Sequence, residues 1–423
     1  MNSFEGLHLS SPILQALKSK GYNAPTPVQQ KAIPLILEGK DLFGSAQTGT
    51  GKTAAFALPL LHLMSTRKTA HPRVRTLVLA PTRELALQIS ENFHAYARNL
   101  GLKHAVIYGG VSQHQQTMAL KKGVETIIAT PGRLLDLMEQ GFVKLNDVEI
   151  LVLDEADRML DMGFIHDIKR IVSKIPAKRQ TLLFSATIPP AIKKLAHELL
   201  HNPSSVDIKP EVNHTALVKQ QIYMVEKTDK TSLLCKLIDD EPIAHALIFT
   251  RTRRGADKLV KALNQKGIRS QAINGDKSQN QRQRVLADFK SKKVHMLVAT
   301  DVASRGIDVK ELSHVINYDM PDMADTYTHR IGRTGRAGAE GVALSFCSRE
   351  ERGLLHDIQK FHRQQLEVMK HGIQPAESNH APAVAVGNET ERKPFREARK
   401  HFGDRNSQHS FLRKKRRPRS RVS

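Results

Sequence analysis

The sequence has few cysteines and no long apolar run. Its 423 residues include only Cys235 and Cys347, which form neither a CxxC pair nor a metal-binding spacing. Because each lies in an apolar segment, we expect both thiols to be buried, reduced and inert, as in a cytosolic protein. No apolar stretch approaches the ~18 residues that a membrane helix needs, and the start lacks the basic-then-apolar order of a signal peptide. These absences argue against a disulfide-stapled secreted protein and against a membrane protein, and they predict a cytoplasmic chain.

Ligand spacing and internal repeats are also missing. The 20 histidines are scattered along the chain, so the sequence predicts no zinc site. The composition is that of a soluble globular protein, but the chain is longer than one hydrophobic core usually organises. The length therefore predicts two domains and a tail.

Acidic residues are too few to balance the basic ones, which leaves a formal net charge of +23. The stretch 390–423 alone holds thirteen Lys and Arg against three Asp and Glu. This excess predicts a polyanionic partner, and Phe395, Phe402 and Phe411 favour nucleic acid because aromatic rings stack on unpaired bases. A solvated, solubilising surface is the alternative. The basic run Arg413–Arg417 is also compatible with a nuclear import signal.

Aliphatic strands and helical segments alternate in two series along the chain. Aliphatic runs without polar alternation are typical of strands buried on both faces, as in parallel sheets. The predicted fold class is therefore α/β, with two tandem parallel-sheet domains, a short linker and a disordered basic C-terminal tail. The predicted boundaries are 1–207 and 219–365 for the domains, 208–218 for the linker and 366–423 for the tail.

A glycine-rich segment precedes a predicted helix in the first domain. Strict phosphate-binding loops carry Gly where this chain has Ala46, but the chemistry is retained because Gly49 and Gly51 permit close backbone approach. Lys52 is expected to reach the β- and γ-phosphates, and Thr53 to offer its hydroxyl to Mg²⁺. A glycine-rich turn that only starts a helix is the alternative.

An acidic segment, Asp154–Asp157, follows directly on the apolar run Ile150–Leu153. Ligands bind at the carboxyl edge of parallel sheets, where Asp154 is placed to hold Mg²⁺ and Glu155 to orient a water. Together with the glycine-rich segment, this predicts a nucleoside triphosphatase.

The second domain has no glycine-rich phosphate loop, but its segment His329–Arg336 places three arginines among glycines. Guanidinium groups fork onto phosphate oxygens, so these arginines are suited to neutralising a transferring γ-phosphate. One nucleotide site served by both domains is the economical model. A basic surface patch is the alternative.

Several short motifs follow one another in order. They are Pro25–Gln29, Ala46–Thr53, Pro81–Ala86, Gly109–Gly110, Thr130–Arg133, Asp154–Asp157, Ser185–Thr187, Ala299–Asp301 with Arg305–Asp308, and His329–Arg336. In this order they resemble the DEAD-box ATP-dependent RNA helicases, over residues 3 to 365, and Arg158–Ile168 suggests the bacterial RhlE type. The resemblance implies two RecA-like domains and makes a cytoplasmic location more natural than a nuclear one.

The resemblance implies an ATP site. Gln29 would hydrogen-bond the adenine, Tyr22 or Phe4 would pack on the ring, and Asp308 would contact the ribose. The phosphate loop would consist of Ala46, Gln47, Thr48, Gly49, Thr50, Gly51, Lys52 and Thr53.

The resemblance also implies roles in catalysis and coupling. Catalytic roles fall to Lys52, Asp154, Glu155, Arg333 and Arg336, and Mg²⁺ would be held by Thr53 and Asp154. The residues that couple hydrolysis to RNA would be Asp157, Ser185, Thr187 and His329.

RNA contacts are implied in both domains. They are Thr82, Arg83, Gly110, Thr130, Arg133, Arg251, Gln279, Arg282 and Thr300. Hydroxyls, glycine N–H groups and arginines suit phosphates and 2′-OH groups, so binding should be largely independent of sequence.

The function implied is local unwinding of short RNA duplexes by ATP- and RNA-driven closure of the two domains, with ATP hydrolysed to ADP and phosphate. An ATP-gated RNA clamp or annealing chaperone is the alternative, and a DNA-directed helicase is a second one. Similar proteins act in ribosome assembly and RNA turnover, but no residue here selects between these partners.

Overall fold

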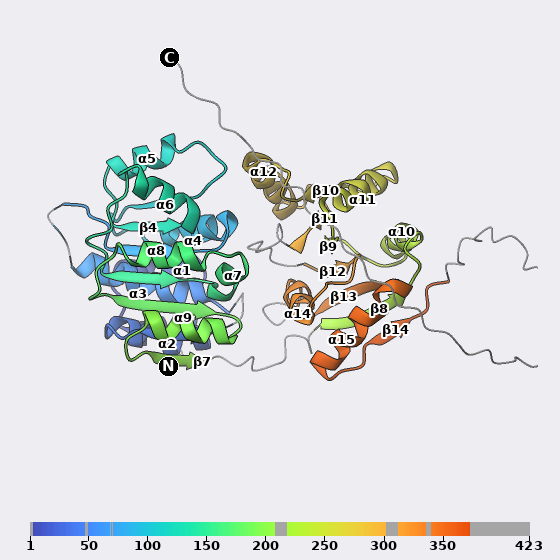
Figure 1. Cartoon of the computed structure of the whole chain (residues 1–423), viewed down its shortest axis with the longest axis horizontal. Coiled ribbons are helices and arrows are strands. Elements are labelled where there is room, and N and C mark those ends of the chain that lie inside the picture. Colours follow the sequence, from blue (N-terminus) through green and yellow to red (C-terminus); the bar gives the residue numbers. More distant parts are fainter. Residues whose placement is uncertain are drawn as a thin grey trace, which may run out of the picture. The chain divides into compact units, whose positions relative to one another are not determined.

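Two seven-stranded parallel sheets organise the chain, as the computed structural model shows (Figure 1). The structure describes residues 3–46, 50–67, 69, 71–207, 218–301, 312–335 and 340–372, without the side chain of Asp325. The chain divides into the units Met1–Ala376 and Glu377–Ser423. We call the described residues up to 207 the first lobe and those from 218 on the second lobe. Most of the predicted linker and the tail from residue 373 on lie outside the described residues.

The first sheet has the strand order β3-β4-β2-β5-β6-β1-β7, and neighbouring strands are parallel. Every residue of the strands β2, β4 and β5 is buried, which explains their unbroken aliphatic sequences. The strands are β1 (Leu42–Ser45), β2 (Thr76–Leu79), β3 (His104–Ile107), β4 (Thr126–Ala129), β5 (Ile150–Leu153), β6 (Gln180–Ser185) and β7 (Ser204–Asp207).

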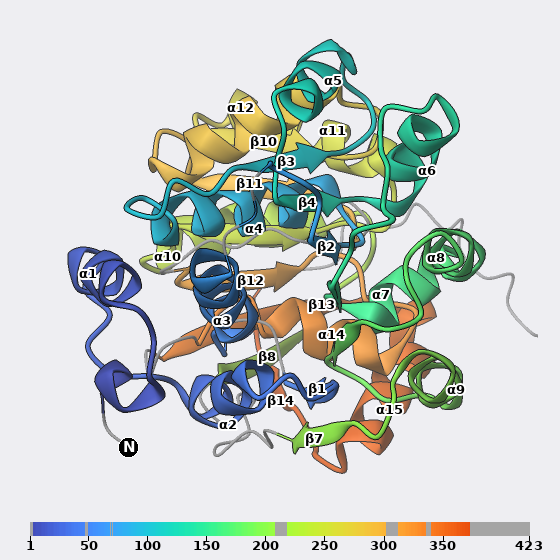
Figure 2. The ribbon, with the colours of Figure 1, turned by 90° about the vertical axis from the view of Figure 1, so that its left-hand side faces the viewer.

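Helices cover both faces of the first sheet. In Figure 2, α3 and α4 lie on one side of its strands and α6, α7, α8 and α9 on the other. The helices are α1 (Ser11–Ser19), α2 (Pro27–Leu37), α3 (Lys52–Thr66), α4 (Arg83–Tyr96), α5 (His114–Lys121), α6 (Pro131–Glu139), α7 (Ala156–Asp161), α8 (Ile165–Val172) and α9 (Pro190–Leu199), after the 3-10 turn η1 (Phe4–Leu7).

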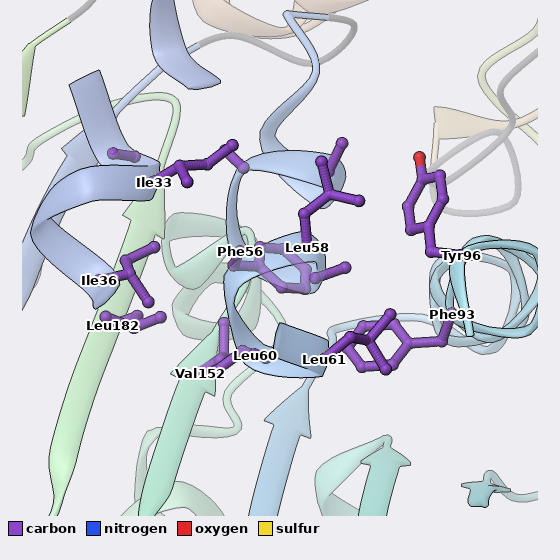
Figure 3. Packing of buried hydrophobic residues seen from close by; sticks show 14 of the residues in the cluster. Ile33, Ile36, Phe56, Leu58, Leu60, Leu61, Phe93, Tyr96, Val152 and Leu182 are labelled. Carbon is purple, nitrogen blue, oxygen red and sulfur yellow. The ribbon is translucent and has the colours of Figure 1, made fainter. Parts of the chain in front are cut away.

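The helix α3 is anchored by an aromatic cluster. Phe56 packs between Phe93 of α4 and Phe184 of β6, with ring centroids 6.4 and 5.6 Å away, and Figure 3 shows the surrounding aliphatic side chains. Phe56, Phe93 and Phe184 are essentially inaccessible to solvent. This packing fixes the start of α3, where Lys52 lies.

The second sheet repeats the same plan, with the strand order β10-β11-β9-β12-β13-β8-β14. Its strands are β8 (Val218–Met224), β9 (Ala246–Phe249), β10 (Ser270–Ile273), β11 (Met296–Ala299), β12 (His314–Asn317), β13 (Gly341–Cys347) and β14 (Glu367–Met369). Its helices are α10 (Lys230–Asp240), α11 (Arg253–Gln265), α12 (Gln279–Lys290), α14 (Ala324–Ile331) and α15 (Arg352–His362), with the 3-10 turn η2 (Arg349–Glu351).

The predicted fold class is confirmed, because each lobe is a parallel sheet with helices between its strands. The strand β14 lies beyond residue 365, where the sequence analysis placed the end of the second domain. It pairs with β8, so the second sheet extends into the segment predicted as tail. Within the described residues, no helix combines the length and the apolar content needed to cross a membrane.

Candidate functional site

A buried lysine marks the start of α3. Gly51 has a φ of 91°, which favours glycine, and it leads directly into Lys52 at the first position of the helix. Lys52 is 6% exposed, and its Nζ atom finds no hydrogen-bond partner among the described residues. An ammonium buried without an acceptor is costly, and a helix N-terminus attracts anions. This position is therefore suited to a phosphate.

The rest of the glycine-rich segment is only partly described. Ala46 is buried and its N–H donates to the Ser185 carbonyl at 3.2 Å, which ties the start of the segment to the end of β6. Thr50 and Thr53 lie in the described part, on either side of Gly51 and Lys52. Gln47, Thr48 and Gly49 lie outside it.

Two carboxylates follow β5. Asp154 is 2% exposed, and burial raises the pKa of its carboxyl to about 6, although the positive charge of Lys52 opposes the shift. The Glu155 backbone has a φ of 52°, in the left-handed region that non-glycine residues seldom occupy. Its N–H donates to Asp154 Oδ1 at 3.0 Å. The turn thus holds two buried acidic residues, and the positive charge of Lys52 acts on the Asp154 carboxyl.

Gln29 links the start of α2 to this segment. Its Oε1 accepts from the Thr26 N–H at 3.0 Å, and its Nε2 donates to the Gly51 carbonyl at 3.1 Å. The first contact is half of a helix capping box. The sequence analysis assigned Gln29 to adenine. The structure shows in addition a direct contact with the backbone next to Lys52.

The two aromatic residues expected at the adenine lie together. Phe4 and Tyr22 stack with centroids 6.5 Å apart and ring planes 23° apart, and the Tyr22 and Tyr96 hydroxyls lie 3.2 Å apart. Phe4 is buried, whereas Tyr22 is exposed. Tyr22 therefore offers the more accessible face of the stack.

Asp157 joins α7 to the end of β6. Its Oδ2 accepts from the Ala186 N–H at 3.2 Å, from the Thr187 N–H at 2.8 Å and from the Thr187 hydroxyl at 2.9 Å. The Ser185 hydroxyl donates to the Thr187 carbonyl at 2.7 Å. The predicted coupling residues of the first lobe are thus one hydrogen-bonded unit.

Sequence reasoning missed a contact of Glu155. The Arg158 guanidinium donates from Nη1 to Glu155 Oε2 at 2.9 Å, and both side chains are less than a tenth exposed. The spacing of three residues at the start of a helix was the available signal, because such pairs share a helix face.

The arginine segment of the second lobe contains two different kinds of arginine. Arg330 is 2% exposed and its guanidinium forms a bidentate pair with Asp301 at 2.6 and 2.7 Å. Arg333 is also buried, and with His329 it lines a cavity of about 430 Å³ whose wall includes Asp157 and other first-lobe residues. Arg336 and Asp308 lie outside the described residues.

A second cavity, of about 410 Å³, gathers most of the residues predicted to bind RNA. Its wall includes Thr82, Arg83, Thr130, Arg133, Gln279 and Arg282. Gly110 adjoins it in structure, because a Cβ atom there would overlap the Arg83 guanidinium.

The side chains of this cavity are held in place by nearby groups. The Thr82 hydroxyl caps α4 by accepting from the Leu85 N–H at 3.2 Å. Arg282 pairs with Glu84, its Nε atom 2.8 Å from Oε1, and Arg83 donates to Gln279 Oε1 at 3.2 Å. These contacts fix a group of polar and cationic side chains around one space.

The cavity is electropositive. Burial lowers the pKa of Arg83, and the charges of Arg282 and Arg133 act in the same direction, against that of Glu84. Clustered arginines of this kind attract phosphate groups.

Two further predicted RNA residues lie at strand ends of the second sheet. The Arg251 N–H, after β9, donates to Asp319 Oδ2 at 2.9 Å, and its Nη2 donates to Glu351 Oε1 at 3.2 Å. Thr300, after β11, is buried. Parallel strands present their carboxyl ends at one edge, so both residues belong to that edge of the second sheet.

Comparisons with known proteins show the family of the chain. The model of the DEAD/DEAH box helicase family matches residues 26–195, and that of the helicase conserved C-terminal domain matches residues 229–338. The ATP-dependent RNA helicase CshA of Listeria monocytogenes is 42% identical over 88% of this chain and 71% of its own length. The CshA of Streptococcus pneumoniae TIGR4 is 44% identical over 88% of this chain and 70% of its own length.

Solved structures show the same fold. Dbp5 of S. cerevisiae bound to RNA and ADP BeF3 superposes with a TM-score of 0.78 at 31% identity, over 87% of this chain and 96% of that chain. A DEAD box protein of Methanococcus jannaschii, 39% identical over 88% of this chain and 99% of its own, gives a TM-score of 0.53. The two lobes are RecA-like domains. The relatives named above are CshA proteins, so the RhlE type is not confirmed. The chain belongs to the family of DEAD-box ATP-dependent RNA helicases.

Proposed function

We propose that this helicase hydrolyses ATP at the start of α3 and uses the cycle to separate short RNA duplexes locally. The observation that carries the site assignment is the buried Lys52 ammonium, which has no hydrogen-bond acceptor among the described residues and lies within the field of Asp154. A β- or γ-phosphate would supply that acceptor. Dbp5, which shares the fold, is bound to ADP BeF3 in its solved structure.

Mg²⁺ fits the same place. Asp154 is a carboxyl buried to the point that its pKa rises to about 6, and a divalent cation would stabilise its ionised form. Thr53, at the second position of α3, adds a hydroxyl. A bound Mg²⁺ would neutralise charge on the phosphate oxygens. Such ions keep waters and need few protein ligands, so Asp154 and Thr53 suffice.

Glu155 is proposed to take a proton from the attacking water. It lies one residue beyond Asp154 on a turn that is fixed by its left-handed backbone and by the hydrogen bond to Asp154. Arg333 and Arg336 are proposed to face the γ-phosphate, and Arg333 lines a cavity together with Asp157. Gln29 donates to the Gly51 carbonyl, so adenine bound at Gln29 would affect the position of the phosphate loop.

RNA is the proposed polyanionic partner. The cavity around Arg83 presents cationic side chains, hydroxyls and helix N-termini, which are groups that contact phosphates rather than base edges. Binding should therefore be largely independent of sequence, as part of a cycle in which ATP and RNA together favour closure of the lobes. We place this activity in the cytoplasm, on ribosomal precursors or in RNA turnover, with the RhlE type as the proposed branch.

The test of the site is Glu155→Gln. We expect this variant to bind ATP and RNA but to hydrolyse ATP at least about 100-fold more slowly, because it has lost a general base. Glu139→Gln on α6 is the matched control, because Glu139 is exposed and pairs with Arg170 at the surface. Rapid turnover by Glu155→Gln would refute the role of Glu155.

The test of the function uses a short blunt RNA duplex. Strand displacement should require ATP and exceed annealing of the same strands, and RNA but not DNA should stimulate hydrolysis. Faster annealing than displacement would identify an ATP-gated clamp or annealing chaperone instead. RNA crosslinked to the protein in its own cell and then sequenced would name the substrates.

A further inference from the structure

Arg158 and Glu155 form a buried ion pair that the proposed hydrolysis of ATP does not require. The Nη1 atom of Arg158 lies 2.9 Å from Glu155 Oε2, and the two side chains are 8% and 4% exposed. Within the described part of the chain, the Arg158 guanidinium donates no other side-chain hydrogen bond. A buried guanidinium needs a counter-charge, so Glu155 is the group that makes burial of Arg158 tolerable.

This contact opposes the work proposed for Glu155. The Glu155 oxygen that accepts from the Arg158 guanidinium is held by a charge-assisted hydrogen bond, so it is not free to turn toward a water. The ion pair also turns the Glu155 carboxylate toward α7, because Arg158 lies in that helix, three residues further along the chain. Glu155 is therefore a restrained base.

A second chain of contacts leads to Arg158. Asp157 Oδ1 accepts from the Arg158 backbone N–H at 3.0 Å, while Asp157 Oδ2 accepts from the Thr187 N–H and hydroxyl at 2.8 and 2.9 Å. One carboxylate therefore connects the segment after β6 to the residue that holds Glu155. A displacement of Thr187 would therefore act on Asp157 and, through it, on the Arg158 backbone.

We propose that Arg158 is a positioning residue that restrains Glu155 when RNA is absent, and that movement of the Ser185–Thr187 segment on RNA binding releases this restraint through Asp157. The inference rests on the proposed function, because it requires Glu155 to be the base. Under this proposal, the ion pair inside the first lobe slows ATP hydrolysis when RNA is absent. Under this proposal, Arg158 itself touches neither ATP nor the attacking water.

The decisive variant is Arg158→Gln in the full chain. We expect its RNA-free kcat to rise about ten-fold, which is the rate change that loss of one charge-assisted hydrogen bond to the base would produce. The kcat at saturating RNA should change by less than this, so the ratio of stimulated to basal rate falls. KM for ATP should stay within about two-fold, because Arg158 does not hold the nucleotide.

Two further variants control the measurement. Arg158→Lys keeps a cation within reach of Glu155, so it should retain most of the restraint. Arg170→Gln removes an equally charged but exposed side chain that pairs with Glu139, and it should leave the ratio unchanged. If Arg158→Gln fails to fold in thermal unfolding, Arg158→Met replaces it, because methionine fills irregular space with little strain.

The outcomes separate the inference from the proposed function. RNA-stimulated hydrolysis by the unmodified chain, abolished in Glu155→Gln, upholds the function whatever Arg158 does. An unaltered ratio in Arg158→Gln, or equal losses with and without RNA, would overturn the restraint alone. Absence of ATP hydrolysis in the unmodified chain would remove the function and the inference together.

Discussion

Each lobe has a lysine at the same point of the fold, but the two ammonium groups differ in their contacts. The strands β1 and β8 hold equivalent positions in the two sheets, and the helices that follow them begin at Lys52 and Lys230. Both lysines are buried. The Lys52 ammonium has no hydrogen-bond acceptor in the described part of the chain. The Lys230 ammonium lies 2.7 Å from Glu351, 3.3 Å from Asp319 and 2.8 Å from the Tyr318 carbonyl.

The buried carboxyl groups near the two lysines also differ, in the direction in which their pKa is shifted. Asp154 follows β5, and Asp319 follows the equivalent strand β12. Burial raises the pKa of Asp154. Burial acts in the same direction on Glu351, but hydrogen bonds from Lys230 and Ser348 outweigh it and lower the pKa of that carboxyl. The second lobe thus supplies carboxylates of its own to its buried lysine, whereas the Lys52 ammonium finds no acceptor among the described residues of the first lobe.

One fold thus carries a proposed phosphate site in the first lobe and an internal ion group at the equivalent point of the second lobe. In the second lobe, Glu351 also accepts from Arg251 and from the Met320 N–H. The internal ion group therefore fixes Arg251, a proposed RNA contact, at the edge of the sheet.

The largest expected effect is on stability in the second lobe. Lys230→Met should lower the free energy of unfolding by about 3–5 kcal/mol, because it leaves Glu351 and Asp319 as buried charges without their cation. Urea unfolding of the full chain, followed by circular dichroism, measures the change. Lys258→Met on α11 is the control, because Lys258 is exposed. A loss under 1 kcal/mol would mean that the carboxylates need no internal cation.

The equivalent substitution in the first lobe should act in the opposite sense. Without nucleotide, Lys52→Met should leave the free energy of unfolding unchanged or raise it by about 1 kcal/mol, because it removes a buried ammonium that has no hydrogen-bond acceptor in the described part of the chain. ATP hydrolysis should fall at least about 100-fold, because the cation for the phosphates is gone. The same unfolding and turnover assays apply, with the exposed Lys174→Met as control. A stability loss like that of Lys230→Met would break the contrast between the lobes.

The sequence predicted much of the Lys52 site in the first lobe and little of the Lys230 ion group in the second lobe. Unbroken aliphatic runs identified strands such as β5 because both faces of a parallel sheet are buried, and that placed Asp154 at a strand end. The P-loop pattern singled out Lys52. Nothing in the sequence around Lys230 indicated an ion group, because Glu351 is far along the chain and only the sheet brings them together.

The details of the site that sequence could not supply depend on backbone geometry. The three arginines of His329–Arg336 look alike in the sequence. In the structure, Arg330 is held by Asp301, Asn317 and the Asp319 carbonyl, whereas Arg333 lines the cavity with Asp157. The contact of Gln29 with Gly51 depends on the capping turn of α2. Such roles follow from burial and partners, which residue type alone does not fix.

The smallest effect concerns the cysteines, both of which are free, buried and in the second lobe. Burial raises the pKa of the Cys347 thiol to about 11 and also raises that of Cys235. Because only the thiolate reacts, alkylation of folded protein at pH 8 should be about 100-fold slower for Cys347 than for an unperturbed thiol. The rate should rise about ten-fold per pH unit until the thiol pKa is reached.

Since the first lobe has no cysteine, labelling reports on the second lobe alone. Lys230→Met should therefore speed alkylation by opening that lobe, whereas Lys52→Met should not. Equal acceleration by both variants would show that the two lysines support one common structure, and the contrast between the lobes would fail.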